Sequence, residues 1–126
     1  MSKIIGIGTD MCAVSRMEKA IERAHFYERV FFEEERAYLE KKENARAQSA
    51  AAMFAAKEAV SKALGTGFIR GIMPWTIEVT HDEAGKPGVN LHGAAKERLE
   101  AIGGQDVHLS LTHEGDTAMA FVIIEG

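Results

Sequence analysis

The spacing of apolar residues along the chain follows one period in its first half and another after Pro74. In the first half, apolar residues recur every three or four positions, which is typical of amphipathic helices. After Pro74, apolar and polar residues alternate, which is typical of half-buried strands. The first pattern predicts helices over residues 15–24, 31–44 and 45–64. The second predicts strands over 75–80, 89–91, 107–111 and 118–124, with turns at 83–86 and 114–116 and a short helix over 93–102 between the two hairpins.

The stretch KIIGIGTD at residues 3–10 also alternates, and it predicts a first strand that joins the later sheet. Ile5 and Ile7 share one face, while Ile4, Gly6, Gly8 and Asp10 share the other. Glycine is a poor strand former, so glycines on one face indicate that something approaches the backbone closely there. The pattern as a whole indicates an α+β fold, with helices concentrated early and antiparallel strands late.

Local signals place the helix ends. Ser15 and Glu18 fit a capping box, S-x-x-E, which predicts the start of a helix that runs to about Ala24. On that helix Arg16, Lys19 and Arg23 share a face. Gly65 is expected to end the long, alanine-rich helix.

Composition and charge narrow the class of protein. A length of 126 residues predicts a single domain over residues 1–126, and 46% hydrophobic and 27% charged residues are ordinary for a globular protein. We expect no membrane span and no secretion signal. The one cysteine, Cys12, excludes an internal disulfide and favours the cytoplasm. A net charge of −4 argues against nucleic-acid binding, although a local basic patch can still meet an acidic partner.

One stripe of the long helix has the chemistry of a ligand site. Ala51, Ala55, Glu58, Lys62 and Gly65 recur at spacings of three and four residues. Mg²⁺ takes one or two protein carboxylates together with phosphate oxygens and water, and Asp10 and Glu58 can supply them. The lysines Lys57 and Lys62 and the Gly65–Gly67 amides would then bind a diphosphate. The plainer alternative is that Glu58 and Lys62 form an ordinary surface ion pair.

Two segments carry a family resemblance. GIGTDMCAVSR at residues 6–16 and FAAKEAVSKALGTG at 54–67 resemble the two signature motifs of the holo-[acyl-carrier-protein] synthases, the short bacterial-type 4′-phosphopantetheinyl transferases. The length, the motif separation, the GKP turn at 85–87 and the closing HLSLTHEGDTAMAFVII segment also agree with this family.

The resemblance implies a fold, a reaction and partners. The fold would be that of 4′-phosphopantetheinyl transferases, an antiparallel sheet packed against a long helix and shorter helices. The reaction would transfer the 4′-phosphopantetheine arm of coenzyme A to a serine of apo-acyl carrier protein, in fatty acid biosynthesis. It would use Mg²⁺ and release adenosine 3′,5′-bisphosphate. The family assembles as a homotrimer with active sites between subunits.

The resemblance also assigns roles to residues. Asp10 and Glu58 would bind the metal, and Asp10, Glu58 and Lys62 would be catalytic. Glu58 is our candidate base, either directly or through a metal-bound water, and His113 is a second candidate. The expected coenzyme A contacts are Lys57, Ser61, Lys62, Gly65, Thr112 and His113. The expected carrier-protein contacts are Arg16, Arg23 and Arg29.

The chain departs from the family at one position and leaves some choices open. Met53 stands where many members carry an arginine, so the way in which the 3′-phosphate of coenzyme A is held stays open. The preference for Mg²⁺ over Mn²⁺ and the pathway of the carrier protein, fatty-acid or polyketide, are open as well. Two other functions compete: a coenzyme A-binding module without transferase activity, and a metal-dependent diphosphate hydrolase.

Overall fold

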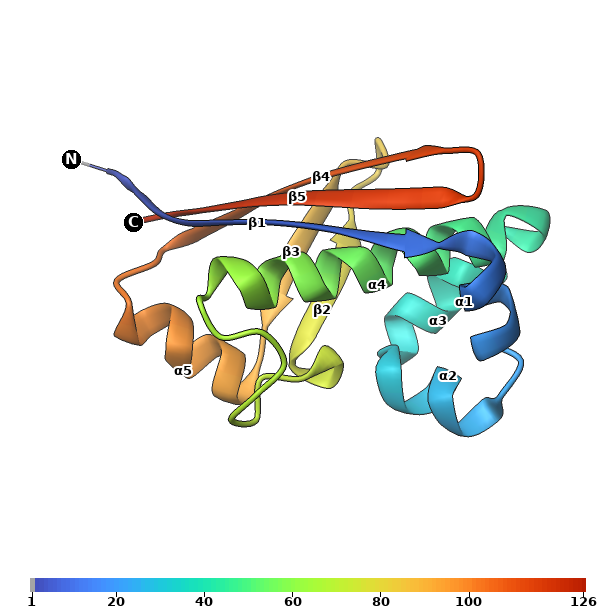
Figure 1. Ribbon diagram of the computed structural model, residues 1–126, viewed down its shortest axis with the longest axis horizontal. Helices are drawn as coiled ribbons and strands as arrows, with labels where there is room; N and C mark the ends of the chain where they lie inside the picture. The colour runs from blue at the N-terminus through green and yellow to red at the C-terminus, as the bar shows by residue number, and fades with distance from the viewer. Residues whose placement is uncertain (1) are drawn as a thin grey trace.

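The computed structural model describes residues 2–126, and its main feature is a three-stranded antiparallel sheet that lies across one long helix (Figure 1). The sheet contains β1 (Ile4–Ala13), β4 (Asp106–Glu114) and β5 (Thr117–Glu125) in the order β1-β5-β4. The first strand therefore pairs with the last, as the alternation at residues 3–10 predicts. A register shift between Ile4 and Gly6 separates Ile4 from the face that carries the glycines.

The long helix α4 (Arg46–Ala63) packs directly against β1. A Cβ atom at Gly6 would overlap the carbonyl oxygen of Ala63, and one at Gly8 would overlap that of Ala59. The prediction that something approaches the strand backbone closely at these glycines is therefore confirmed. The approaching group is the backbone of α4, which leaves no empty space beside Gly6 and Gly8. Ala59 is fully buried, so this contact belongs to the core.

The second half contains a separate hairpin and a short helix. The hairpin consists of β2 (Ile77–His81) and β3 (Pro87–Leu91), and α5 (Gly93–Ala101) follows it. The prediction that residues 75 and 76 belong to the strand is wrong, because Pro74–Thr76 forms a 3₁₀ turn. Trp75 is 37% exposed and Thr76 is buried, which reverses the expected inward and outward sides.

The first half contains more helices than the sequence pattern predicts. They are α1 (Val14–Ala20), α2 (Ala24–Val30), α3 (Glu33–Glu40) and the 3₁₀ turn η1 (Glu43–Ala45). The capping box at Ser15 and Glu18 is wrong, since Ser15 lies inside α1 and the carboxylate of Asp116 caps this helix instead. Asp116 accepts hydrogen bonds from the Ser15 backbone N–H at 2.8 Å and the Ser15 hydroxyl at 2.6 Å. Within residues 2–126 no helix is long and apolar enough to cross a bilayer.

Candidate active site

The packing of β1 on α4 brings Asp10 to Glu58 and Lys62. Asp10 lies two residues beyond Gly8 on the same face of the strand, so it points to the side of α4 that carries Glu58 and Lys62. The Lys62 ammonium donates to Asp10 Oδ1 at 2.9 Å and to the Thr9 carbonyl at 3.1 Å. Three residues that the sequence separates by about 50 positions thus form one cluster.

The two carboxyl groups of this cluster destabilise each other when both are ionised. Burial, the hydrogen bond to Asp10 and the negative charge of Asp10 together raise the pKa of Glu58 to about 7, and burial contributes most. Lys62 acts in the opposite direction on Glu58, and its own pKa is raised by the hydrogen bond to Asp10. Glu58 is therefore poised to exchange a proton near neutral pH.

These residues fit a hard divalent cation. Two adjacent carboxylates that repel each other are the donors that Mg²⁺ uses, and a bound cation would relieve the repulsion that raises the pKa of Glu58. Among residues 2–126 no cluster of three or more histidine, cysteine or acidic side chains could hold a metal. A cation held by Asp10 and Glu58 would therefore need oxygens from substrate or water to complete its shell.

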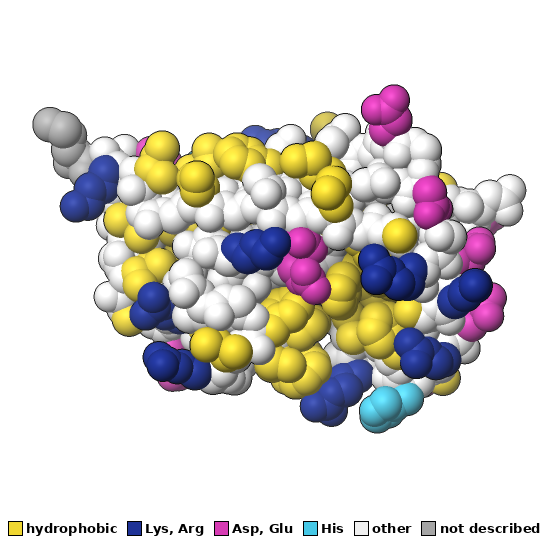
Figure 2. Space-filling view, in the orientation of Figure 1, with side chains coloured by type: hydrophobic (Ala, Val, Ile, Leu, Met, Phe, Trp, Pro, Cys, Tyr) yellow, Lys and Arg dark blue, Asp and Glu magenta, His cyan; other side chains and the backbone are white. Residues whose placement is uncertain are grey.

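A groove of about 360 Å³ opens beside the carboxylates. Its remaining walls are largely apolar and come from β1, α1, α2 and α4. The lining residues are Asp10, Met11, Cys12, Arg16, Met17, Ala20, Phe26, Phe54 and Glu58. In Figure 2 a patch of hydrophobic atoms lies in the middle of the face, with acidic and basic side chains around it. A ligand with an apolar portion and a charged end would match this groove.

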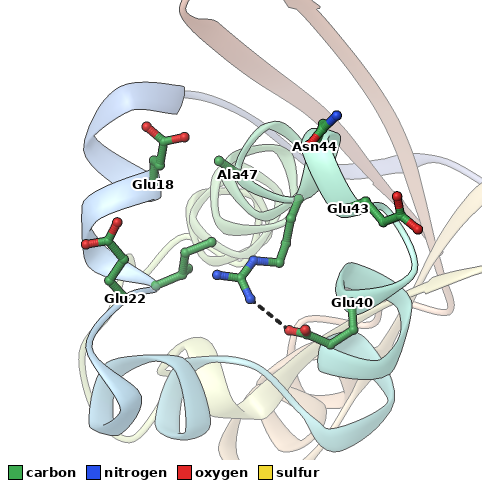
Figure 3. Close-up of a pocket in the computed structure, with 8 residues that line it drawn as sticks. Glu18, Glu22, Glu40, Glu43, Asn44 and Ala47 are labelled. Carbon is green, nitrogen blue, oxygen red and sulfur yellow. Dashed lines mark hydrogen bonds and ion pairs between the residues drawn. The ribbon is translucent and has the colours of Figure 1, made fainter.

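A larger hollow lies elsewhere and does not contain the predicted chemistry. It has a volume of about 450 Å³ and lies between α1, α3 and the start of α4 (Figure 3). Four glutamates surround it, namely Glu18, Glu22, Glu40 and Glu43. Arg46 also lines it and pairs with Glu40 at 3.0 Å. Because it repels anions and includes none of the predicted site residues, we assign the site to the smaller groove.

Lys57 and Ser61, which were predicted to contact coenzyme A, do not reach this groove with their side chains. Lys57 is 0% exposed, and its ammonium donates to Glu35 Oε1 at 2.8 Å. It also donates to the carbonyls of Pro74 at 3.1 Å and Ile77 at 2.6 Å. Ser61 is 2% exposed and donates to the Glu58 carbonyl at 2.6 Å. Both side chains hold the fold together.

The Gly65–Gly67 loop closes the end of α4 and has no free amide for a phosphate. Gly65 N–H donates to the Lys62 carbonyl at 2.9 Å, while Thr66 and Gly67 N–H both donate to the Ser61 carbonyl, at 3.2 and 3.1 Å. Gly65 has φ +84°, a conformation that glycine adopts readily after the last residue of a helix. The expected helix stop is confirmed, and the amides that were expected to bind a phosphate donate within the chain instead.

Thr112 and His113 lie on β4 and line a different hollow from the carboxylates. Met11, Thr112, His113 and Met119 are among the residues that line it. His113 Nδ1 lies 2.8 Å from Gln48 Nε2, which fixes the ring against the start of α4. One chain alone therefore does not bring His113 to the groove of Asp10 and Glu58.

Met53, which stands where many family members carry an arginine, is 1% exposed, so it packs in the core and is not at the surface.

The three predicted docking arginines lie on α1, just before α2 and on α2. Arg16 lies on α1 and lines the groove, whereas Arg23 precedes α2 and Arg29 lies in its last turn. The single-helix stripe of Arg16, Lys19 and Arg23 is wrong because α1 ends at Ala20. Arg23 lies over the Phe26 ring at 5.6 Å, and Arg29 lies over the Trp75 ring at 4.1 Å.

Sequence reasoning missed residues that line the groove and residues that hold the predicted site residues in place. Phe26 and Phe54 form an apolar wall of the groove, Glu35 neutralises Lys57, and Gln48 orients His113. Hydrophobic aromatic residues beside a charged stripe could have indicated the wall. Nothing in the sequence indicates the partners of Lys57 and His113, which are 22 and 65 residues away.

A family model described as the 4′-phosphopantetheinyl transferase superfamily matches residues 6–122. The chain belongs to this family. It is 48% identical over 123 residues to a protein named holo-[acyl-carrier-protein] synthase from Treponema denticola, with 98% of this chain and 99% of the relative covered. The resemblance of the two signature motifs is thereby confirmed, and so is the expected enzyme class.

Solved structures of family members have the same fold. The crystal structure of holo-[acyl-carrier-protein] synthase from Neisseria meningitidis matches with a TM-score of 0.86 and 35% identity, covering 98% of this chain and 100% of that one. The Helicobacter pylori enzyme, solved in complex with coenzyme A, matches with a TM-score of 0.80 and 29% identity, covering 94% and 98%. The expected α+β fold of 4′-phosphopantetheinyl transferases is confirmed.

Proposed function

We propose that this enzyme transfers the 4′-phosphopantetheine arm of coenzyme A to a serine of apo-acyl carrier protein, as a step of fatty acid biosynthesis in the cytoplasm. The observation that carries the proposal is the Asp10–Glu58 carboxyl pair beside Lys62, at the mouth of a largely apolar groove. The names of the relatives support it, and one solved relative is described in complex with coenzyme A.

In this reaction the serine hydroxyl oxygen attacks the β-phosphorus of coenzyme A. The bond from that phosphorus to the bridging oxygen breaks, and adenosine 3′,5′-bisphosphate leaves with the electron pair. We propose that the serine proton passes to Glu58, either directly or through a water, because Glu58 is the carboxyl group beside Asp10 and Lys62 whose proton affinity the site already raises. The Lys62 ammonium, which is half exposed, stabilises negative charge on the diphosphate oxygens.

A magnesium ion held by Asp10 and Glu58 would supply positive charge to the same diphosphate oxygens. Both carboxylates also keep Lys62 in place, since Asp10 accepts its hydrogen bond and Glu58 attracts it. We propose Mg²⁺ because the donors are two carboxylate groups, whose hard oxygen atoms suit this cation.

The apolar groove and the arginines around it would receive the carrier protein. Arg16 lies at the groove itself, and Arg23 and Arg29 flank its Phe26 wall through α2. Charge reversal at Arg16 and Arg23 should raise KM for the carrier protein and leave KM for coenzyme A unchanged. Equal changes in both constants would contradict this docking surface.

We propose that the enzyme acts as a homotrimer, with Thr112 and His113 of one subunit completing the coenzyme A site of the next. The outer face of the sheet supports assembly, because large apolar side chains lie exposed on it. They are Ile7, Met11, Met119 and Phe121, with exposed fractions of 62%, 66%, 36% and 40%. Hydrophobic atoms gather along the upper edge of Figure 2, where the sheet lies in Figure 1. Such a face on a small protein favours contact with another copy.

Mass spectrometry of an apo carrier protein incubated with enzyme, coenzyme A and Mg²⁺ tests the reaction. Transfer of the arm adds about 340 Da to the carrier protein. Asp10→Asn and Glu58→Gln should abolish the gain, whereas Glu100→Gln, an exposed acid on α5 outside the groove, should not. Cleavage of coenzyme A without the mass gain would identify a diphosphate hydrolase. Binding of coenzyme A without either reaction would identify a binding module.

A further inference from the structure

Trp75 and Arg29 form a close stack at the surface beside the groove. The Arg29 guanidinium carbon lies 4.1 Å from the centre of the Trp75 ring. Arg29 is three residues after Phe26 on α2, so the two side chains share a face of that helix, and Phe26 lines the groove. The stack therefore adjoins the apolar wall of the proposed docking surface.

The turn that carries Trp75 is anchored from inside the protein. Lys57 donates to the carbonyl of Pro74 just before Trp75 and to that of Ile77 two residues after it. Pro74 restricts φ at the start of the same turn, and the Thr76 hydroxyl donates to the Met73 carbonyl at 2.8 Å. The indole thus sits on a fixed support, although 37% of Trp75 is exposed.

Arg29 is held by the ring and not by an acid. Within residues 2–126 its guanidinium forms no ion pair and no hydrogen bond, in contrast to Arg46, which pairs with Glu40. A guanidinium that lies over an aromatic ring, with no acid as its partner, keeps N–H donors free for other acceptors. Its charge is oriented and still available to an external carboxylate.

We propose that Trp75 is a positioning residue that orients Arg29 toward acidic side chains of the carrier protein. The inference rests on the proposed function for the identity of the partner. Fixing the arginine before binding removes part of the entropy that a flexible side chain loses on docking. The effect belongs to recognition of the carrier protein and does not extend to coenzyme A.

Replacement of the ring tests the inference through the two Michaelis constants. Trp75→Leu should raise KM for the carrier protein about two- to fivefold, the effect of one exposed cation–π contact. Trp75→Phe keeps an aromatic face and should have a smaller effect. KM for coenzyme A should not change in either variant. In an Arg29→Ala background, Trp75→Leu should produce no further increase, because Trp75 acts through Arg29.

Trp75 is the only tryptophan of the chain, so its fluorescence reports on the stack directly. Arg29→Ala should change the emission of the free enzyme, and addition of a tryptophan-free apo carrier protein should change it in the wild type. The control Arg70→Ala, an unpaired arginine after the Gly65–Gly67 loop, should leave the emission of the free enzyme unchanged.

Three results would overturn the inference. They are an equal rise of both Michaelis constants in Trp75→Leu, an additive effect of Trp75→Leu and Arg29→Ala, and an unchanged KM for the carrier protein in Trp75→Leu. Failure of the wild-type enzyme to modify any carrier protein is a different result, since it refutes the proposed function itself.

Discussion

Replacement of Lys57 by methionine should destabilise the protein strongly without creating a specific defect in coenzyme A binding. The ammonium of Lys57 is fully buried and has three oxygen partners, on α3, on the Pro74–Thr76 turn and at the start of β2. Methionine fills a similar volume but removes the charge and all three hydrogen bonds.

The size of the destabilisation follows from the buried Glu35 carboxylate that Lys57→Met leaves without its partner. Glu35 is 1% exposed and would keep only the backbone N–H groups of Phe32 and Val79, both at 2.7 Å. Breaking a buried ion pair on one side costs about 3–5 kcal/mol. That is a large part of the roughly 5–15 kcal/mol by which folded proteins are stable.

A double substitution separates lost pairing from lost packing. Lys57→Met with Glu35→Gln removes both charges, so it should be more stable than Lys57→Met alone, with a coupling of about 1 kcal/mol or more. Lys62→Met is the matched control on the same helix. Its ammonium is half exposed, so loss of its pair with Asp10 should change stability by about 0–1 kcal/mol.

Urea unfolding at one fixed protein concentration measures these differences, with Trp75 fluorescence and far-ultraviolet circular dichroism as independent probes. A loss below about 1 kcal/mol in Lys57→Met would refute the buried-pair reasoning. So would wild-type stability accompanied by a raised KM for coenzyme A, which would restore Lys57 as a ligand contact.

Three further predictions concern the site, the packing and the assembly. The raised pKa of Glu58 means that the folded, metal-free protein resists ionisation of this carboxyl group. The stability of the wild type, relative to Glu58→Gln, should therefore decrease as the pH rises from 4.5 to about 7. Thermal melting in the presence of a chelator over this pH range tests the sign, and a relative stability that increases with pH would contradict it. Gly8→Ala should cost about 3 kcal/mol or more, because its Cβ would overlap the Ala59 carbonyl, whereas Thr9→Ala on the exposed side of β1 should be mild; equal melting temperatures would contradict this packing. Phe121→Glu on the outer sheet face should reduce the solution mass measured by light scattering from three times 13.8 kDa to that of one chain, and an unchanged mass would place the subunit contact elsewhere.

Local sequence signals located most of the regular structure but not the short helices. Alternation identified both hairpins, and Gly65 marked the end of α4 correctly. The signals failed between residues 13 and 31, where the helix predicted over 15–24 ends at Ala20 and α2 was not predicted. The reason lies in the cap of α1, since Asp116 comes from the β4–β5 turn about 100 residues away. A local capping box cannot reveal such a partner.

The lysines of α4 illustrate a second limit. Lys57 and Lys62 are five residues apart, and both were predicted to bind a diphosphate, although only Lys62 lies on the helix stripe that carries Glu58. One is fully buried and the other is half exposed. Helical spacing defines angles around the helix axis but not which angles face the core, so the sequence could not distinguish a structural lysine from one that is open to a ligand.

The sequence by itself determined the family, the α+β pattern and the chemical types at the site, because each of these depends on residue identity and on spacing over a few positions. Only the tertiary structure decided which groups are accessible to a ligand. It buried Lys57, closed the Gly65–Gly67 amides, separated His113 from the carboxylates and stacked Arg29 on Trp75. These outcomes depend on burial and on partners distant in sequence, and burial is a property of the packed chain as a whole.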